Sequence, residues 1–419
     1  MMATRLATFG ASAATVATAV LLSPAAVMAV PPGTVVAAHP TTTYVRSAAH
    51  WRVSFLSPGS KPNTLETVAA ISAESAWAAG FTFSQGSHPS PPVLRWNGTR
   101  WRQVRVPGTS GTDFADVAAS SGADVWISAT NADTGKNVVR RWDGRRWHSV
   151  PSAPGGAVVR VVLSRANAWA EGGIFCIHNL RHCRTTLEHW NGRSWSRFTV
   201  PTFVDEMAGS ASGNVWVVGE FGGDPTPPAT PGRPVSFRWN GKSWRATSMP
   251  RPLSFFPASI DVVSRRNVWI GARKATSSGP GPGYALHWNG IRWRRISAPS
   301  RLNTVGPVLA DGVGVWLGPD AHWTGKRWIN TTPGHSFARG RTVGIDRMAL
   351  IPGTRSIWAV GAVGVNRSAL TFRGLIAIYG TSATNRGSQP APARSPLTMG
   401  QTRGVAPMWA SSSRATICE

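Results

Sequence analysis

The chain has 419 residues, with 44 Lys or Arg against 18 Asp or Glu, so its formal net charge is +26. This length allows a sizeable core, and so basic a balance favours anionic partners such as acidic envelope polymers or nucleic acid. Only three Tyr are present, which argues against tyrosine nucleophiles and copper–tyrosine radical sites. Nearly all the bases are Arg, which a genome rich in G and C would also produce without any anionic partner.

The amino-terminal residues 1–29 have the pattern of an export signal. Arg5 is followed by a weakly apolar run over residues 7–22, and Val27-Met28-Ala29 matches a small-residue cleavage site. Ser, Thr and Gly interrupt this run, and no other stretch approaches about 18 apolar residues. We therefore expect a secreted protein with no membrane span in the mature chain, which begins with a linker over residues 30–50.

From residue 51 onward the chain repeats two tryptophan markers. One is a hexapeptide of the form Trp-(Asn/Asp/Thr)-Gly-x-x-Trp, and the other is a single Trp among small or aliphatic residues. The period of roughly 35 to 50 residues is typical of propellers and other repeat arrays. The hexapeptides begin at Trp96, Trp142, Trp190, Trp239, Trp288 and Trp323, and the single markers are Trp77, Trp126, Trp169, Trp216, Trp269, Trp316 and Trp358.

Residues 66–107 illustrate one repeat. Strands are predicted over residues 68–72, 76–81, 93–96 and 100–104, the first with small side chains and the last with tryptophan. Asn97-Gly98 between two β-prone runs is a strong hairpin signal, because both residues tolerate a positive φ. A two-residue loop would make Trp96 and Trp101 diagonal neighbours, a four-residue loop would oppose them directly, and a three-residue loop with a bulge would separate their faces.

The markers predict an all-β, seven-bladed β-propeller of four-stranded blades over residues 51–380. The last blade contains Trp358 but no second hairpin Trp, and Phe372 takes the place of the first. We expect the strand from Trp51 to Leu56 to complete this blade and close the ring, since closure removes exposed edges. In the rival arrangement residues 375–379 form the outer strand. The blades are expected near 66–107, 114–151, 157–201, 204–250, 258–299, 305–333 and from 343, and residues 381–419 are expected to be a disordered tail.

This repeat, an aliphatic-Trp strand followed by a Trp-Asn-Gly-x-x-Trp hairpin and a Pro, resembles that of the exported, tryptophan-rich β-propeller proteins common in actinomycetes. The resemblance covers about residues 51–380. It implies the fold rather than an activity, because propellers carry enzymes, lectins and scaffolds alike. The chain lacks the regular Gly-Gly pairs of kelch repeats, the terminal Trp-Asp of WD repeats and the sialidase Ser-x-Asp-x-Gly-x-x-Trp box. Sialidase and galactose-oxidase chemistry therefore does not carry over.

Acidic residues at the start of the blades are the candidate ligand-binding residues. In a propeller this position lies at the rim of the central channel, where carboxylates could hydrolyse a glycoside, bind a sugar or hold Ca²⁺. The plainer alternative is that they are solvated residues in turns. Asp205 and Glu206 would point to opposite faces of a strand, which weakens them as an acid/base couple. The candidates are Glu66, Asp116, Asp205, Glu206 and Asp261, with Asp346 less well aligned.

Cysteine, histidine and arginine supply the remaining candidates. Cys176 and Cys183 are expected to form a disulfide that closes one loop, although His178 and His182 between them leave a zinc site as the alternative, and Cys418 is left over. Three histidines that precede hairpin tryptophans are expected to be structural. Arginines interleaved with the hairpin tryptophans are expected to stack on the rings and to make the outside positive. The histidines are His189, His287 and His322.

Together these features favour a secreted, non-catalytic and monomeric binding or scaffold module without a cofactor. Its ligand would be a carbohydrate or an anionic cell-envelope polymer, with nucleic acid ranked below them. Two alternatives stay open. One is a propeller glycoside hydrolase that uses Glu66, Asp116 and Glu206, and the other is a protein-interaction domain. The latter would use the long inserts over residues 172–186, 220–234 and 272–283.

Overall fold

The computed structural model describes residues 49–381, apart from 59–62, 84–89, 113, 132–133, 136, 177–182, 211–213, 222–232, 251–254, 277–278, 299–305, 334–342 and 367–370. The predicted export signal, nearly all of the linker, the predicted tail and Cys418 lie outside these residues. Within them the regular structure comprises 28 strands and one 3₁₀ turn, η1 (Pro154–Gly156). No helix found there has the length and apolar character needed to cross a membrane.

The strands follow one another in groups of four, which we number as units one to seven. Unit one contains β2 (Asn63–Ser72), β3 (Ser75–Thr82), β4 (Val93–Trp96) and β5 (Trp101–Gln103). Unit two contains β6 (Phe114–Ser121), β7 (Asp124–Thr130), β8 (Asn137–Trp142) and β9 (Trp147–Val150). Unit three contains β10 (Val158–Ser164), β11 (Asn167–Cys176), β12 (Cys183–Trp190) and β13 (Trp195–Val200). Unit four contains β14 (Phe203–Ser210), β15 (Asn214–Phe221), β16 (Arg233–Trp239) and β17 (Trp244–Thr247).

The remaining units follow the same plan. Unit five contains β18 (Phe255–Ser264), β19 (Asn267–Thr276), β20 (Gly279–Trp288) and β21 (Trp293–Ser297). Unit six contains β22 (Val308–Ala310), β23 (Val315–Leu317), β24 (Ala321–Trp323) and β25 (Trp328–Asn330). Unit seven contains β26 (Val343–Leu350), β27 (Ile357–Asn366) and β28 (Thr371–Gly380), together with β1 (His50–Leu56) from the other end of the described chain. The inserts at 172–186 and 272–283 are thus largely extended strands rather than loops.

Every pairing between neighbouring strands is antiparallel. Units three to seven each form a separate four-stranded sheet, and units one and two are joined into one eight-stranded sheet through the pair Phe81–Phe114. The first strands of successive units lie against one another, β2 against β6, β6 against β10, and so on to β22 against β26. Side-chain hydroxyls link these layers, as where Thr67 Oγ1 accepts a hydrogen bond from the Val117 amide at 3.1 Å. The chain is therefore all-β, with four-stranded sheets in a propeller-like order.

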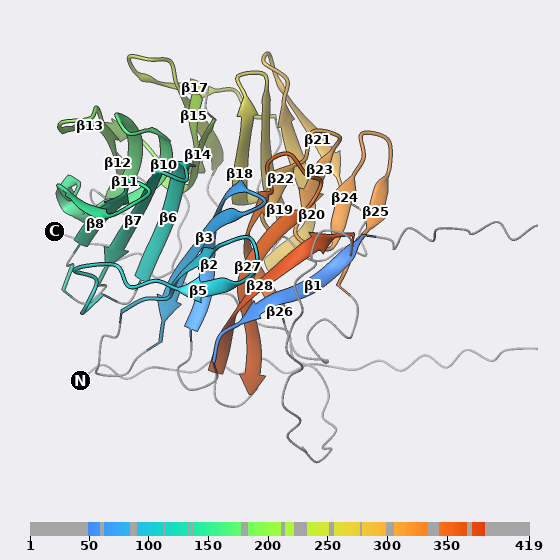
Figure 1. Ribbon diagram of the computed structural model, residues 1–419. Coiled ribbons are helices and arrows are strands. Elements are labelled where there is room, and N and C mark those ends of the chain that lie inside the picture. Colours follow the sequence, from blue (N-terminus) through green and yellow to red (C-terminus); the bar gives the residue numbers. More distant parts are fainter. Residues whose placement is uncertain are drawn as a thin grey trace, which may run out of the picture. The chain divides into compact units, whose positions relative to one another are not determined.

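The predicted pairing of the amino-terminal strand with the last unit is present in the structure. β1 lies alongside β28, with Trp51 opposite Tyr379 (Figure 1). Residues 375–379 belong to β28 itself, so β1 is the fourth strand and not a redundant one. The assignment of Phe372 as the substitute for the first hairpin Trp is wrong. Tyr379 pairs with Ile357 as Trp96 pairs with Ala76, so the aromatic substitute is Tyr379.

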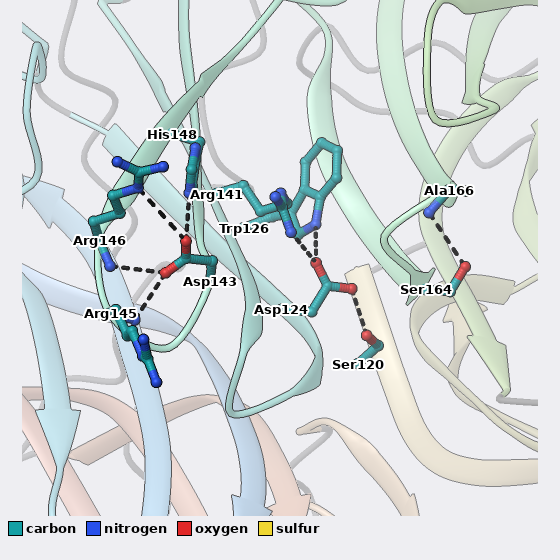
Figure 2. A network of polar contacts seen from close by, with 10 residues as sticks. All are labelled: Ser120, Asp124, Trp126, Arg141, Asp143, Arg145, Arg146, His148, Ser164 and Ala166. Carbon is teal, nitrogen blue, oxygen red and sulfur yellow. Dashed lines mark hydrogen bonds and ion pairs between the residues drawn. The ribbon is translucent and has the colours of Figure 1, made fainter.

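The hairpin loops have four residues, which resolves the alternatives left open by the sequence. Trp96 lies directly opposite Trp101, and their ring centroids are 5.7 Å apart. Gly98 takes a φ of +92°, while the Asn97 side-chain oxygen accepts hydrogen bonds from the amides of Thr99 and Arg100. Asp143 has the same role in unit two, accepting from the amides of Arg145 and Arg146 (Figure 2). The first loop residue is therefore selected for its side-chain acceptor.

Each single-marker tryptophan is buried beneath the hairpin pair of the following unit. Trp77 is 1% exposed, and the rings of Trp142 and Trp147 lie 6.2 and 5.7 Å from it. Trp358 of the last unit packs in the same way on Trp96 and Trp101 of the first, at 5.0 and 5.1 Å. Edge-on aromatic contacts add roughly 0.5–1.5 kcal/mol beyond area burial. The same arrangement recurs for Trp126 with Trp190 and Trp195, Trp169 with Trp239 and Trp244, Trp216 with Trp288 and Trp293, and Trp316 with Trp51 and Tyr379.

Candidate functional site

Bulges in the first strands place polar side chains where the units meet. The register of units one, three, four and seven skips one residue, namely Glu66, Arg160, Asp205 and Asp346. In unit one Gly80 lies opposite the bulge, and a Cβ on it would come within 2.1 Å of the Thr64 carbonyl oxygen. A glycine is therefore required there, because the bulged backbone approaches the second strand too closely for any side chain.

Arg160 of β10 binds two carboxylates from different strands. Its guanidinium hydrogen-bonds to Asp116 of β6 and lies 3.4 Å, Nε to Oε2, from Glu171 of β11. Only 16% of the Arg160 side chain is exposed, against 4% and 5% for the two carboxylates. Burial lowers the pKa of Arg160, but Asp116, Glu171 and Glu206 together raise it above its usual range. The three side chains therefore form a charged, nearly dry group that fixes unit two against unit three.

Arg347 of β26 forms a second ion pair across the units. Its Nη2 donates to both carboxylate oxygens of Glu206 in β14, at 3.0 and 3.2 Å. The charge of Glu206 raises the pKa of Arg347, and Asp116 adds to the effect, whereas burial and the charge of Arg160 oppose it. A pair that joins unit seven to unit four shows that first strands far apart in the sequence converge on one place.

Two further carboxyl groups lie within the reach of these charges. Burial raises the pKa of Glu66, and the charge of Asp116 raises it further, although its hydrogen bond with Thr64 and the two arginines oppose this. Burial and the charge of Glu66 raise the pKa of Asp346 to about 7, against the weaker opposing effect of Arg347. These two acids therefore hold protons far more readily than solvated carboxyls.

We refer to these residues together as the central charge cluster, which combines predicted and unpredicted members. The structure brings together Glu66, Asp116 and Glu206, whose convergence the sequence left open, and also Asp346. Sequence reasoning missed Glu171 and both arginines. The cluster consists of Glu66, Asp116, Arg160, Glu171, Glu206, Asp346 and Arg347.

Asp205 and Asp261 are the two remaining candidates. Asp205 is the residue left out of register in β14, beside Glu206. The Asp261 carboxylate accepts a hydrogen bond from the Ala310 amide at 2.7 Å and so joins unit five to unit six. Burial raises the pKa of Asp261 to about 6, with the backbone hydrogen bonds from Ala310 and Val262 opposing it. Asp261 therefore has a structural contact between units five and six.

The residues of the central charge cluster fit an internal ionic network better than a cation site. The described residues contain no group of three or more His, Cys, Asp or Glu that could hold a metal ion. The carboxylates of Asp116, Glu171 and Glu206 are instead paired with guanidinium groups. Asp116 and Glu206 are each held in an ion pair, with Arg160 and Arg347 respectively.

Exposed charge lies outside the central charge cluster and is almost entirely positive. Of the acidic residues that the structure describes, only Glu74 is exposed. The turn after the first strand and the hairpin loop lie side by side at one end of a unit, where the Trp96 indole donates to the Ala73 carbonyl at 2.9 Å. We call this the hairpin end. Its exposed hairpin-end bases are Arg100, Arg145, Arg146, Arg165, Arg193, Lys242, Arg265, Arg266, Arg292, Lys326, Arg327 and Arg355.

The histidines before the hairpin tryptophans are structural, as expected. His189 stacks on Trp169 at 4.4 Å, and His287 stacks on Trp269 at 4.1 Å. Burial lowers the pKa of both imidazoles. In unit one Arg95 takes the same position over Trp77, with its guanidinium carbon 5.3 Å from the ring centroid. These cross-strand pairs explain the interleaving of Trp with cationic residues that the sequence displays.

Cys183 is disulfide-bonded and lies opposite Cys176 at the end of the β11–β12 ladder. A disulfide at Cys183 agrees with the first of the two alternatives, and its formation with Cys176 stays a prediction. His178 and His182, which the zinc alternative would have used, lie outside the described residues. The central part of the insert over residues 220–234 also lies outside them.

Comparisons with known proteins address the fold alone. No family model matches the sequence, and no curated protein matches it. Among solved structures, YCF48 bound to D1 peptide is 15% identical, with a TM-score of 0.49, over 81% of this chain and 96% of that chain. The β-propeller domain of the Trilobed protease from Pyrococcus furiosus is 9% identical, with a TM-score of 0.49, over 78% and 100%. Polysaccharide lyase Uly1 is 8% identical, with a TM-score of 0.47, over 75% and 89%.

Proposed function

We propose that this chain is a secreted, non-catalytic binding module built as a seven-bladed β-propeller, which β1 closes into a ring. Closure is supported by the pairing of β1 with β28 and by the packing of β2 against β26, β27 and β28. The packing of Trp358 on Trp96 and Trp101 also supports it, since it repeats between the last and first units the contact made by their neighbours. The ligand is an anionic polysaccharide of the cell envelope, which the hairpin-end bases bind.

The observation that carries this proposal is the separation of charge by sign. Composition alone explains the number of arginines. It does not explain why the acidic side chains are buried or half-buried while many basic side chains are exposed. Described carboxylates such as those of Asp116 and Glu206 are paired with arginines, and of the acids that the structure describes only Glu74 is exposed. A surface with one sign of charge attracts anionic polymers along its whole extent and accumulates many weak contacts.

Glycan hydrolysis at the central charge cluster is the second candidate. It is favoured by the pKa of about 7 for Asp346 beside Glu66, because a protonated carboxyl is what a general acid requires. It is disfavoured by the ion pairs of Asp116 and Glu206, which remove two of the three predicted catalytic carboxylates. Incubation with the retained polysaccharide decides the matter: new reducing ends that vanish in Asp346→Asn would establish hydrolysis.

Retention on immobilised polygalacturonate tests binding, with neutral dextran and double-stranded DNA as comparison matrices. We expect retention on polygalacturonate at about 50 mM salt and release at about 500 mM, because salt screens exposed charges. Replacing three hairpin-end bases (Arg145, Arg193 and Arg292) with Gln should weaken binding roughly tenfold, at about 0.2–1 kcal/mol for each charge.

The matched control replaces three exposed bases at the opposite end of the units, where the second and third strands connect. Arg184, Arg233 and Lys274 lie there, and their replacement with Gln removes the same net charge. Equal loss in both triple variants would show that net charge alone governs retention, and would refute binding by the hairpin ends. Stronger retention on DNA than on polygalacturonate would reassign the ligand to nucleic acid.

A further inference from the structure

A cavity of about 340 Å³ lies among the hairpin ends of units three, four and five. β11 and β12 supply Trp169 and His189 to its lining, and β16 supplies Arg238 and Trp239. Asn240 of the unit-four hairpin loop and Arg265 of the β18–β19 turn complete the polar lining. No acidic residue lines it. The cavity thus opens among the hairpin-end bases and offers hydrogen-bond donors without a competing carboxylate.

The charge of Arg238 is uncompensated, and comparison with unit two shows the reason. In unit two Asp124 accepts the Trp126 indole N–H at 3.0 Å and also lies 3.7 Å from Arg141 (Figure 2). In unit four Asn214 takes the place of Asp124 and accepts the Trp216 indole N–H at the same 3.0 Å. The amide keeps the hydrogen bond to the indole but carries no charge, so it cannot neutralise an arginine.

Arg238 is held in place without using its charge. Its guanidinium carbon lies 5.9 Å from the Trp216 ring centroid, and its buried Nε has no hydrogen-bond partner among the described residues. Arg265 is exposed, and within the described part of the chain neither arginine forms an ion pair. An unpaired guanidinium at a partly buried position is the group that most readily takes a bidentate oxyanion.

The other walls of the cavity are rigid and include an aromatic surface. Trp239 is half-buried and packs 4.9 Å from Trp169. His189 stacks on Trp169, and its Nε2–H donates to the Asn167 side-chain oxygen at 3.1 Å. The Asn240 side-chain oxygen is occupied by the loop amides, which leaves its NH₂ group to donate. An aromatic wall beside fixed donors suits a ring that is apolar on one face and polar at its edges.

We propose that this cavity binds one sugar ring that carries an oxyanion, either a carboxylate or a phosphate, with Arg238 and Arg265 taking the anionic group and Trp239 facing the ring. This inference rests on the proposed function and identifies the cavity as the place where one sugar residue of the polymer binds. The volume is at the lower end of the roughly 300–1,000 Å³ typical of ligand pockets, which suits a single sugar residue.

Titration calorimetry of the full chain with glucuronate, glucose 6-phosphate and glucose tests the chemistry. We expect at least one anionic sugar to bind and glucose not to bind. Whichever of glucuronate and glucose 6-phosphate binds more tightly identifies the oxyanion as a carboxylate or a phosphate. Arg265→Ala should weaken that binding at least about tenfold, because charge-assisted hydrogen bonds are lost. Arg266→Ala is the matched control, since it removes the same charge from the same turn but lies outside the lining and leans over Gly290. It should cost at most about threefold.

Asn214→Asp gives a second test that leaves the cavity lining unchanged. The carboxylate would pair with Arg238 as Asp124 pairs with Arg141, and binding of the anionic sugar should fall about tenfold while the Trp216 hydrogen bond persists. Equal effects of Arg265→Ala and Arg266→Ala, or equal binding of glucose, would overturn the cavity proposal. If the wild-type chain is still retained on polygalacturonate when those results are obtained, the proposed function stands without this site. If the wild-type chain is not retained, the proposed function fails too.

Discussion

Replacement of Trp51 with Ala tests whether the amino-terminal strand is an integral part of the last unit. Trp51 is 7% exposed. Its indole N–H donates at 3.0 Å to the carbonyl of Pro319, which lies 268 residues later in the chain. Its ring lies 5.3 Å from that of Tyr379 and 6.2 Å from that of Trp316. Loss of the side chain therefore removes contacts with units six and seven at once.

The expected magnitude follows from these contacts. A tryptophan buries roughly 150–250 Å², which at about 25 cal/mol per Å² amounts to about 4–6 kcal/mol. That figure is an upper bound, because the denatured chain already buries part of the ring. The hydrogen bond to Pro319 contributes about 1 kcal/mol net. We expect Trp51→Ala to lower the free energy of unfolding by about 4 kcal/mol, within the range for removal of a core tryptophan.

Urea unfolding followed by circular dichroism measures this loss, with Trp101→Ala as the matched variant. Trp101 is 6% exposed and occupies in unit one the position that Trp51 occupies in unit seven. If β1 closes the ring, the two substitutions cost the same within about 1 kcal/mol. A loss below about 1 kcal/mol for Trp51→Ala, alongside about 4 kcal/mol for Trp101→Ala, would mean that β1 detaches at little cost and that the ring is open.

Two predictions concern the central charge cluster. Because Asp346 has a pKa of about 7 in the folded chain and 3.8 ordinarily, the fold is favoured below pH 4 and loses up to about 4 kcal/mol as the pH rises to 7. Asp346→Asn should flatten this slope in urea titrations at pH 5 and 8, and an unchanged slope would contradict the assignment. Arg160→Met leaves Asp116 and Glu171 buried without a cation and should cost about 3–5 kcal/mol. Adding Asp116→Asn and Glu171→Gln should restore most of it, and no recovery would indicate a packing effect instead.

The hairpin was readable from the sequence because it depends on local chemistry. An acceptor side chain followed by Gly and flanked by two Trp predicts the turn, whereas the four-residue loop that opposes the rings was one of three alternatives and is given by the structure. The aromatic substitute for the first hairpin Trp in unit seven was misassigned to Phe372. Trp51 has no hairpin partner beside it in the sequence, so nothing local fixes which residue of the last strand it opposes. Tyr379 is identified only by its pairing with both Ile357 and Trp51.

The charged residues were only half predictable, since their partners come from other units. Strand starts pointed to Glu66, Asp116 and Glu206, but nothing near them in the sequence indicates Arg160 or Arg347. One local signal was available. A Gly three residues after the marker tryptophan, as in Trp77 and Gly80, faces a bulge in the first strand of units one, four and seven. Reading the bulge first would have selected Asp346, together with Asp205, but not Arg160, whose bulge lies opposite Trp169 and Ala170.

The two sites differ in how they use arginine, and this difference bears on function. In the central charge cluster each guanidinium is held by carboxylates, so its charge stabilises the contacts between units and cannot serve a ligand. At the hairpin ends the same side chain is exposed, or, at Arg238, rests on an indole with no acid beside it. A single Asp-to-Asn difference between units two and four separates these conditions, because the indole needs only an acceptor. A repeat scaffold can therefore create a binding position in one unit while another, here unit two, keeps the neutralised form.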